Sequence, residues 1–265
     1  MTIRVGIFIV SLTVFAALAG PLLTPYDGRA QELARRLESP SVSHPLGLDE
    51  LGRDILSRLI AGAQISLLVG VSVVGISSLV GMLLGSIAGY AGGRIDDAIS
   101  RVMDVLMAFP GILLAIALVA VLGPSLGNVI LALSVIGWVG YARLVRAQAL
   151  RTRELEFVQA ARALGASASR IVLKHVLPSA FPAVVVQGTL GMAGAIIAEA
   201  ALSFLGLGVQ PPTPSWGTML DAGRSHLFDA PHLTLFPGLA IATLVLGFNF
   251  LGDGLRDRID PRTAR

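Results

Sequence analysis

Long uncharged stretches alternate with short charged ones along this chain of 265 residues. A helix needs about 20 mainly apolar residues to cross the hydrocarbon core of a bilayer. The uncharged stretches therefore predict six membrane-spanning helices, and the turn residues 123–128 divide one stretch into the third and fourth spans. The predicted spans cover residues 5–23, 64–90, 104–122, 128–145, 180–200 and 233–252.

The composition supports an all-α integral membrane protein. Hydrophobic residues make up 54% of the chain and charged residues only 14%, whereas a soluble domain carries about 25% charged residues. The mean hydropathy of +0.77 also excludes a disordered chain. There are no cysteines, so disulfides, thiolate metal sites and cysteine nucleophiles are excluded. The pI of about 9.9 reflects scarce acids, because the net charge is only +3, and it does not indicate a nucleic-acid-binding tail.

The distribution of basic residues predicts the orientation of the spans. Six spans place both termini on one side, and that side carries 14 of the 20 basic residues. The positive-inside rule then places both termini and the 143–178 loop of this multi-pass protein in the cytoplasm. A cleaved signal peptide is an alternative interpretation of the first span. We favour a retained helix because its apolar stretch is long and its retention agrees with the charge bias.

Small residues recur every four positions in the second span, from Ser77 to Gly93. Residues four apart share one helix face, so they predict a surface along which another helix approaches closely. We expect helix packing at Gly81, Gly85 and Gly89. The alternative is that these glycines only reflect the high frequency of glycine in membrane helices.

Two segments outside the membrane have recognisable patterns. Residues 49–59 predict a short interfacial helix, with Asp49 as its cap and an apolar face that includes Ile55. Residues 201–232 contain helix-breaking prolines, and we expect this segment to fold back over the helices. Trp216 is predicted to lie at the membrane–water boundary.

The 143–178 loop is longer than two adjacent helices require. It predicts a first short helix over residues 156–164, a left-handed glycine cap at Gly165, and a second helix over 167–177 that stops before Pro178. A small apolar face flanked by arginines suits a groove on a partner protein, although a solvated connector is the alternative. That face consists of Phe157, Ala160, Ala161 and Leu164.

The motifs of catalysis and of cofactor binding are absent from the sequence. Lys174 is the only lysine, and its context excludes a phosphate-binding loop of the G-x-x-x-x-G-K-[ST] type. The four histidines form no tight ligand pair, and there is no G-x-S-x-G elbow. We therefore expect no catalytic residue, cofactor or metal. Asp104 and Glu199 lie near predicted span ends and are candidate pathway or gate residues, with a capping or structural role as the alternative.

Several motifs together resemble the permeases of binding-protein-dependent ABC importers. Residues 159–166, with Ile171 and residues 175–178, are similar to the "EAA" loop of that family. Residues 44–54, 201–208, 211–216 and the pair 252–256 and 260–262 resemble the dipeptide/oligopeptide/nickel branch, and within it the second, C-type permease.

The resemblance implies the type I ABC importer permease fold, with six transmembrane helices and a cytoplasmic coupling loop. It also implies a homologous second permease as heterodimer partner, two cytoplasmic ATPases, and a periplasmic or lipid-anchored solute-binding protein. Gln159 departs from the glutamate of the motif, which removes one possible salt bridge to an ATPase. The residues implied to contact the ATPase are Phe157, Val158, Gln159, Ala160, Ala161, Arg162, Leu164, Gly165 and Ala166.

The sequence thus predicts a permease subunit without enzyme activity, with peptides as the favoured solute. We divide the chain into a first helix and periplasmic segment (1–58), a permease domain (59–253) and a cytoplasmic tail (254–265). One alternative is a proton-coupled secondary transporter that uses Asp104 or Glu199. It leaves the long loop without a role, and the broken inverted repeats typical of such transporters are not evident. An intramembrane enzyme is disfavoured because the catalytic motifs are missing.

Overall fold

The computed structural model describes residues 2–24 and 26–259, and within these ranges it contains helices and irregular segments but no strand. Five helices are long and apolar enough to span a membrane, or six spans if one bent pair counts as a span. The helices are α1 Thr2–Leu23, α2 Ile55–Ala91, α3 Gly93–Met107, α4 Gly111–Leu122, α5 Leu126–Thr152, α6 Glu156–Ala163, α7 Ala168–Ile171, α8 Leu177–Phe204, α9 Trp216–Gly223 and α10 His232–Ile259.

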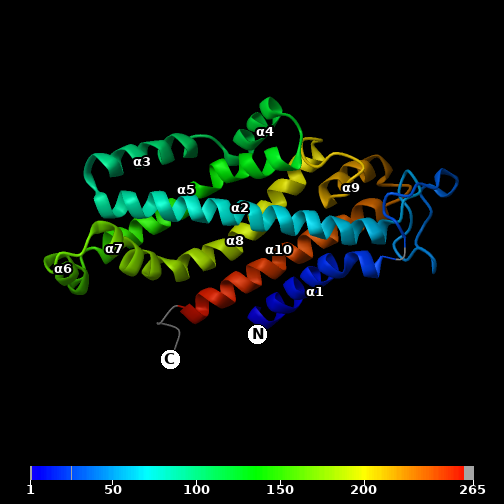
Figure 1. Ribbon diagram of the computed structural model, residues 1–265. Coiled ribbons are helices and arrows are strands. Elements are labelled where there is room, and N and C mark those ends of the chain that lie inside the picture. Colours follow the sequence, from blue (N-terminus) through cyan, green and yellow to red (C-terminus); the bar gives the residue numbers. More distant parts are fainter. Residues whose placement is uncertain (1, 25, 260–265) are drawn as a thin grey trace.

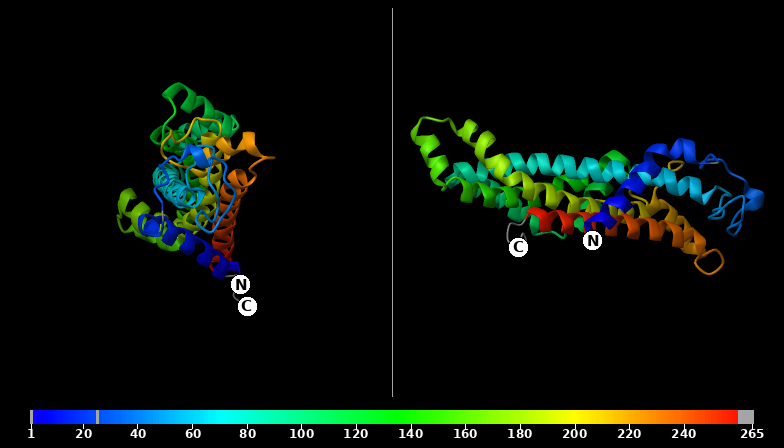
Figure 2. Two further views of the ribbon diagram at one scale, coloured as in Figure 1. Left: turned by 90° about the vertical axis from the view of Figure 1, so that its right-hand side faces the viewer. Right: turned by 90° about the horizontal axis from the view of Figure 1, so that it is seen from below.

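The long helices form an elongated bundle (Figure 1). Helices α2, α5 and α8 run side by side, and α1 packs along α10 on one flank. Helix α6 lies at one extremity of the bundle, whereas α9 and the segment that joins α1 to α2 lie at the other (Figures 1 and 2). The start of α1 lies beside the end of α10, because Gly254 faces Ile3.

Glycines on one face of α2 bring its backbone against that of α5. A Cβ atom added at Gly81 would lie 2.8 Å from the Trp138 carbonyl oxygen, and one at Gly89 would lie 2.5 Å from that of Arg146. Between them, a Cβ at Gly85 would collide with the Ala142 carbonyl oxygen. The structure therefore places all three glycines of the predicted packing surface at a helix contact inside this chain.

Helix α1 makes equally close contacts with α10. A Cβ at Gly6 would lie 2.6 Å from the Leu251 amide nitrogen, and one at Gly247 would lie 2.7 Å from Ile9 Cγ2. The first apolar helix thus packs into the bundle.

The third predicted span, residues 104–122, does not form one straight helix. Helices α3 and α4 meet at an angle of 86° across a short break. The break falls at Pro110, because the residue before a proline is disfavoured in helical geometry and proline itself lacks an amide hydrogen. Helix α4 then has 12 residues, about 18 Å of rise, which is well short of a bilayer core of about 30 Å.

The predicted interfacial helix capped by Asp49 is wrong. Residues 49–54 form turns, with Gly52 at a φ of +72°. Helix α2 begins at Ile55, and its cap is Asp54, which accepts hydrogen bonds from both Ser57 N and Ser57 Oγ at 2.8 Å. Residues 49–54 of the predicted interfacial helix therefore belong to a loop. Its residues 55–59 and the second predicted span belong to one helix of 37 residues.

The second predicted helix of the 143–178 loop does not stop before Pro178. Helix α7 continues through a π-helical turn at Val172–Val176 directly into α8. In that wider turn the Leu177 amide bonds to the Val172 carbonyl oxygen. Pro178 follows directly after this π-helical turn, at the start of α8. Because α5 extends to Thr152, only residues 153–167 connect the two long helices.

A network of hydrogen bonds orders the segment between α1 and α2. His44 Nδ1 lies 2.9 Å from Asp54 Oδ1, and Arg35 Nη1 lies 3.2 Å from His44 Nε2. An arginine only donates, so Nε2 accepts and Nδ1 donates to Asp54. Arg35 also bonds to Glu38 through two nitrogens, which lowers the pKa of that carboxyl below its ordinary value.

The segment after α8 folds back over the bundle, as predicted, and its short helix α9 packs on α8, α10 and α2. The predicted place of Trp216 at a membrane–water boundary is wrong. Its side chain is buried against Gly62, and its indole nitrogen donates to the Leu59 carbonyl oxygen at 2.8 Å. Trp216 therefore joins α9 to the first turns of α2.

We predict that Gly85→Leu separates α2 from α5 and lowers the unfolding free energy by about 1–3 kcal/mol or more, because the side chain meets backbone. The measurement is the free energy of unfolding in detergent, followed by a spectroscopic probe attached to α5. Gly75→Leu is the matched control, since Gly75 is in the same helix and a Cβ there meets nothing within 4 Å. Equal stability of the two variants would show that the glycine contact does not hold these helices together.

Candidate functional site

The end of the bundle that carries α6 is the first candidate site. Helix α6 begins after Leu155, with Glu156 in its first turn and Arg162 in its last. This arrangement complements the helix dipole. The helix ends with hydrogen bonds from Leu164 N to Ala160 O and from Ala166 N to Ala161 O, both 3.0 Å. Gly165 has a φ of +82°, which confirms the predicted left-handed cap.

One side of α6 is held against the rest of the chain. Val158 is only 1% exposed, and the Arg162 guanidinium lies over the Tyr90 ring at 5.4 Å from its centroid. The rings of Phe157 and His175 meet edge to face, with centroids 5.5 Å apart. Val158 therefore anchors the helix to the bundle. The resemblance names it among the ATPase contacts, but its buried side chain does not belong to the exposed face of α6.

The other side of α6 carries exposed apolar groups. Leu164 is 89% exposed, and Phe157, Ala160 and Gly165 are also exposed, whereas Ala161 is half-buried. Leu155 and Leu173 are also exposed. The sequence analysis did not single them out, although each stands next to a charged residue outside the predicted spans. The exposed Phe157 and Leu164 of α6 form an apolar tip at this extremity of the bundle (Figure 1).

Gln159 is also exposed, on a different face of α6 from Phe157 and Leu164. Its side-chain nitrogen donates to the Glu154 carbonyl oxygen at 3.2 Å. A carboxylate at this position cannot donate that hydrogen bond. The side-chain amide thus stabilises the turn that precedes α6. Glutamine in place of the motif's glutamate therefore has a structural role within this chain.

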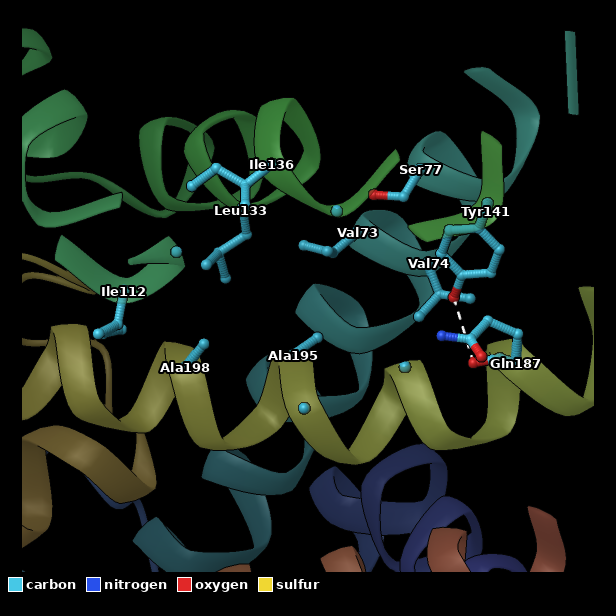
Figure 3. A pocket seen from close by; sticks show the side chains of 14 residues that line it. Val73, Val74, Ser77, Ile112, Leu133, Ile136, Tyr141, Gln187, Ala195 and Ala198 are labelled. Atoms are coloured by element: carbon cyan, nitrogen blue, oxygen red, sulfur yellow. Dashed lines mark hydrogen bonds between the residues drawn. The ribbon is translucent and has the colours of Figure 1, made fainter. Parts of the chain in front are cut away.

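The second candidate site is a cavity of about 270 Å³ between α2, α4, α5 and α8. Its walls are mostly apolar and contain several glycines and alanines. Figure 3 shows Ser77, Tyr141 and Gln187 grouped at one end of the cavity. The Tyr141 hydroxyl donates to the Gln187 carbonyl oxygen at 3.5 Å. The cavity can hold a small solute with little directional binding.

Neither predicted pathway carboxylate lines this cavity. Asp104 is exposed on α3 and forms an ion pair with Arg143 of α5, with 2.6 Å between Oδ1 and Nη2. Glu199 is fully buried in α8, where its Oε1 accepts from Ser203 Oγ at 2.7 Å. Asp104 thus ties α3 to α5, and Glu199 bonds the last turns of α8.

Comparison with known proteins adds three findings. A family model described as "Binding-protein-dependent transport system inner membrane component" matches residues 81–265. A dipeptide transport system permease protein of Alkalihalophilus pseudofirmus is 46% identical over 97% of this chain and 85% of its own length. A glutathione transport system permease protein of Pectobacterium atrosepticum is 44% identical over 99% of this chain and 87% of its own length.

The fold also has a solved relative. A chain of the MetNI methionine ABC transporter, in an inward-facing conformation, matches with a TM-score of 0.62 at 20% identity. The match covers 78% of this chain and 98% of the other. At this identity the likeness shows the fold alone.

We predict that Tyr90→Ala loosens α6 by removing the ring beneath Arg162. A cation–π contact at an exposed site contributes about 0.5–1 kcal/mol, so amide hydrogen exchange over residues 156–166 should rise about two- to fivefold. Tyr90→Phe is the control, since it keeps the ring. If Tyr90→Ala leaves the exchange rates unchanged, the ring does not hold the helix.

Proposed function

Because this chain belongs to the family of binding-protein-dependent transport system inner membrane components, we propose that it forms one half of the path by which small peptides cross the bacterial inner membrane. It is a multi-pass permease subunit of an ABC importer, and ATP hydrolysis belongs to separate subunits. The proton-coupled alternative has no support from these relatives.

Small peptides are the proposed solute because the two relatives described above carry dipeptide and glutathione in their names. The cavity between α2, α4, α5 and α8 is consistent with such a solute, because its mostly apolar wall and few polar groups allow passage without tight binding. A homologous second permease forms the other half of the path, and a solute-binding protein delivers the peptide.

The orientation belongs to the same proposal. The start of α1 and the end of α10 lie side by side, which agrees with both termini on one side. Most of the basic residues belong to the side that carries α6. We place that side in the cytoplasm and the segment between α1 and α2 in the periplasm.

The observation that carries the coupling proposal is the apolar tip on α6. This helix is anchored by Val158 and Arg162, yet it presents Phe157 and Leu164 to solvent outside the long helices. A rigid helix with an exposed apolar face fits a cleft on a partner protein. We assign residues 157–166 as the coupling segment that an ATPase subunit holds, with Val158 as its internal anchor.

Coupling is tested with Gly165→Val. The backbone at Gly165 is left-handed, so valine is strained there. Apart from the adjacent residues, no atom of the described chain lies within 4 Å of the added Cβ. We expect normal membrane insertion, but loss of most of the peptide uptake and of the ATPase activity stimulated by the binding protein in the reconstituted complex.

The matched control for this variant is Gly123→Val. Gly123 also has a positive φ, +92°, and open space around its Cβ, but it lies in the turn between α4 and α5. If both variants lose activity equally, general strain explains the result and the coupling role is wrong.

Orientation is tested with reporter fusions. A fusion after Arg153 and one at the C-terminus should both report the cytoplasm, and a fusion near Arg36 should report the periplasm, because basic residues are retained inside. A periplasmic signal at Arg153 would overturn the proposed topology.

A further inference from the structure

A second cavity lies at the end of the bundle opposite α6. It has a volume of about 260 Å³ and lies between the first residues of α2, the segment after α8 and helix α9. Its wall is more polar than that of the cavity in Figure 3 and includes Glu50, Arg53, Arg58 and Thr213. In the proposed orientation this cavity faces the periplasm.

Two buried arginines in this wall share one carboxylate. Arg53 Nε lies 2.7 Å from Asp49 Oδ2, and Arg58 Nε lies 3.4 Å from the same oxygen. The two arginine side chains are only 9% and 6% exposed. A buried charge needs a counter-charge nearby, and here the charges of Asp49 and Glu50 both act on Arg58.

The guanidinium groups also keep free donors. Arg58 uses Nη1 to donate to the Gly28 carbonyl oxygen at 3.3 Å. Within the described residues, the two terminal nitrogens of Arg53 make no hydrogen bond. Arg58 Nε also lacks a hydrogen bond, but this atom is buried away from solvent. The terminal nitrogens of Arg53 are held by its ion pair with Asp49, so they present a preformed site for a carboxylate.

Two acidic residues, Glu50 and Asp221, line the same cavity. Asp221 is paired with Arg224, with 3.1 Å between Oδ1 and Nε. Glu50 is half-buried and forms no direct ion pair within the described part of the chain, although its charge acts on Arg58. The lining of the cavity thus includes two guanidinium groups and the Glu50 carboxylate.

We propose that this cavity is an outer binding site for a short zwitterionic peptide. Arg53 and Arg58 bind its terminal carboxylate, and Glu50 binds its terminal ammonium group. This inference rests on the proposed function, which makes peptides the solute. The cavity is smaller than the range of about 300–1,000 Å³ typical of sites for drug-sized ligands. That size favours a dipeptide or tripeptide over an inserted protein loop.

The test measures direct peptide binding to the assembled permease complex in lipid nanodiscs, without the binding protein and without ATP. The probes are Ala-Ala, its N-acetyl form, which lacks the ammonium group, and its amide, which lacks the carboxylate. Removal of a charged hydrogen-bond partner costs about tenfold or more in affinity. We expect each blocked probe to bind about tenfold or more weakly than Ala-Ala.

Variants assign each end of the peptide to its partner. Arg53→Gln should lose the preference for Ala-Ala over the amide, and Glu50→Gln should lose the preference over the N-acetyl form. Thr213→Trp should weaken all binding by filling the cavity, while it leaves the ion pairs intact. Arg36→Gln is the matched control, because Arg36 is exposed in the same segment and does not line the cavity.

The outcomes separate this site from the proposed function. Uptake of Ala-Ala by the complete transporter without direct binding, or equal binding of all three probes, overturns the site and leaves the function intact. Direct binding without uptake supports the site and overturns the peptide solute. If Arg53→Gln weakens docking of the binding protein while Ala-Ala binding is unchanged, the arginines belong to a protein interface and the site is wrong.

Discussion

The close approach of α2 and α5 is the contact on which the rest of the structure depends. Three glycines let the two backbones meet, so a side chain at Gly85 would push the helices apart. Both helices line the cavity in Figure 3. The same two helices also hold α6 in place. Helix α5 leads into α6, and Tyr90 near the end of α2 lies beneath Arg162 of α6. One helix contact therefore supports the solute cavity and the tip proposed to meet the ATPase.

The two ends of the bundle are held by different kinds of interaction. At the end with α6, a buried valine and a ring contact anchor a short helix whose other face stays exposed. At the opposite end, buried ionic groups such as His44, Asp54 and Asp49 fix a segment with little regular structure. Such groups are stable away from water only when they are paired. A precise polar network thus replaces the apolar packing that an irregular segment lacks.

The sequence predicted the features that depend on local chemistry. Most spans follow from length and hydropathy, and the cap at Gly165 follows from the conformational freedom of glycine. The misplaced features depend on contacts between distant segments. Trp216 looks like a boundary residue until its bond to Leu59 is known. The resemblance counts Val158 among the ATPase contacts, and only the packing of α6 on the bundle shows that its side chain is buried. Asp49 and Asp54 both suit the N-terminal cap of a helix. The positive φ of Gly52 interrupts helical geometry between them, so Asp54 is the residue that caps α2.

The length of α2 sets the distance between the lipid surface and the coupling tip. Its 37 residues rise about 55 Å, whereas a bilayer with its headgroups is about 40–45 Å thick. In the proposed orientation α2 starts on the periplasmic side, so a helix of this length extends beyond the cytoplasmic headgroups at the end where α6 lies. An ATPase held at α6 in the proposed way would meet the permease at a distance from the lipid surface.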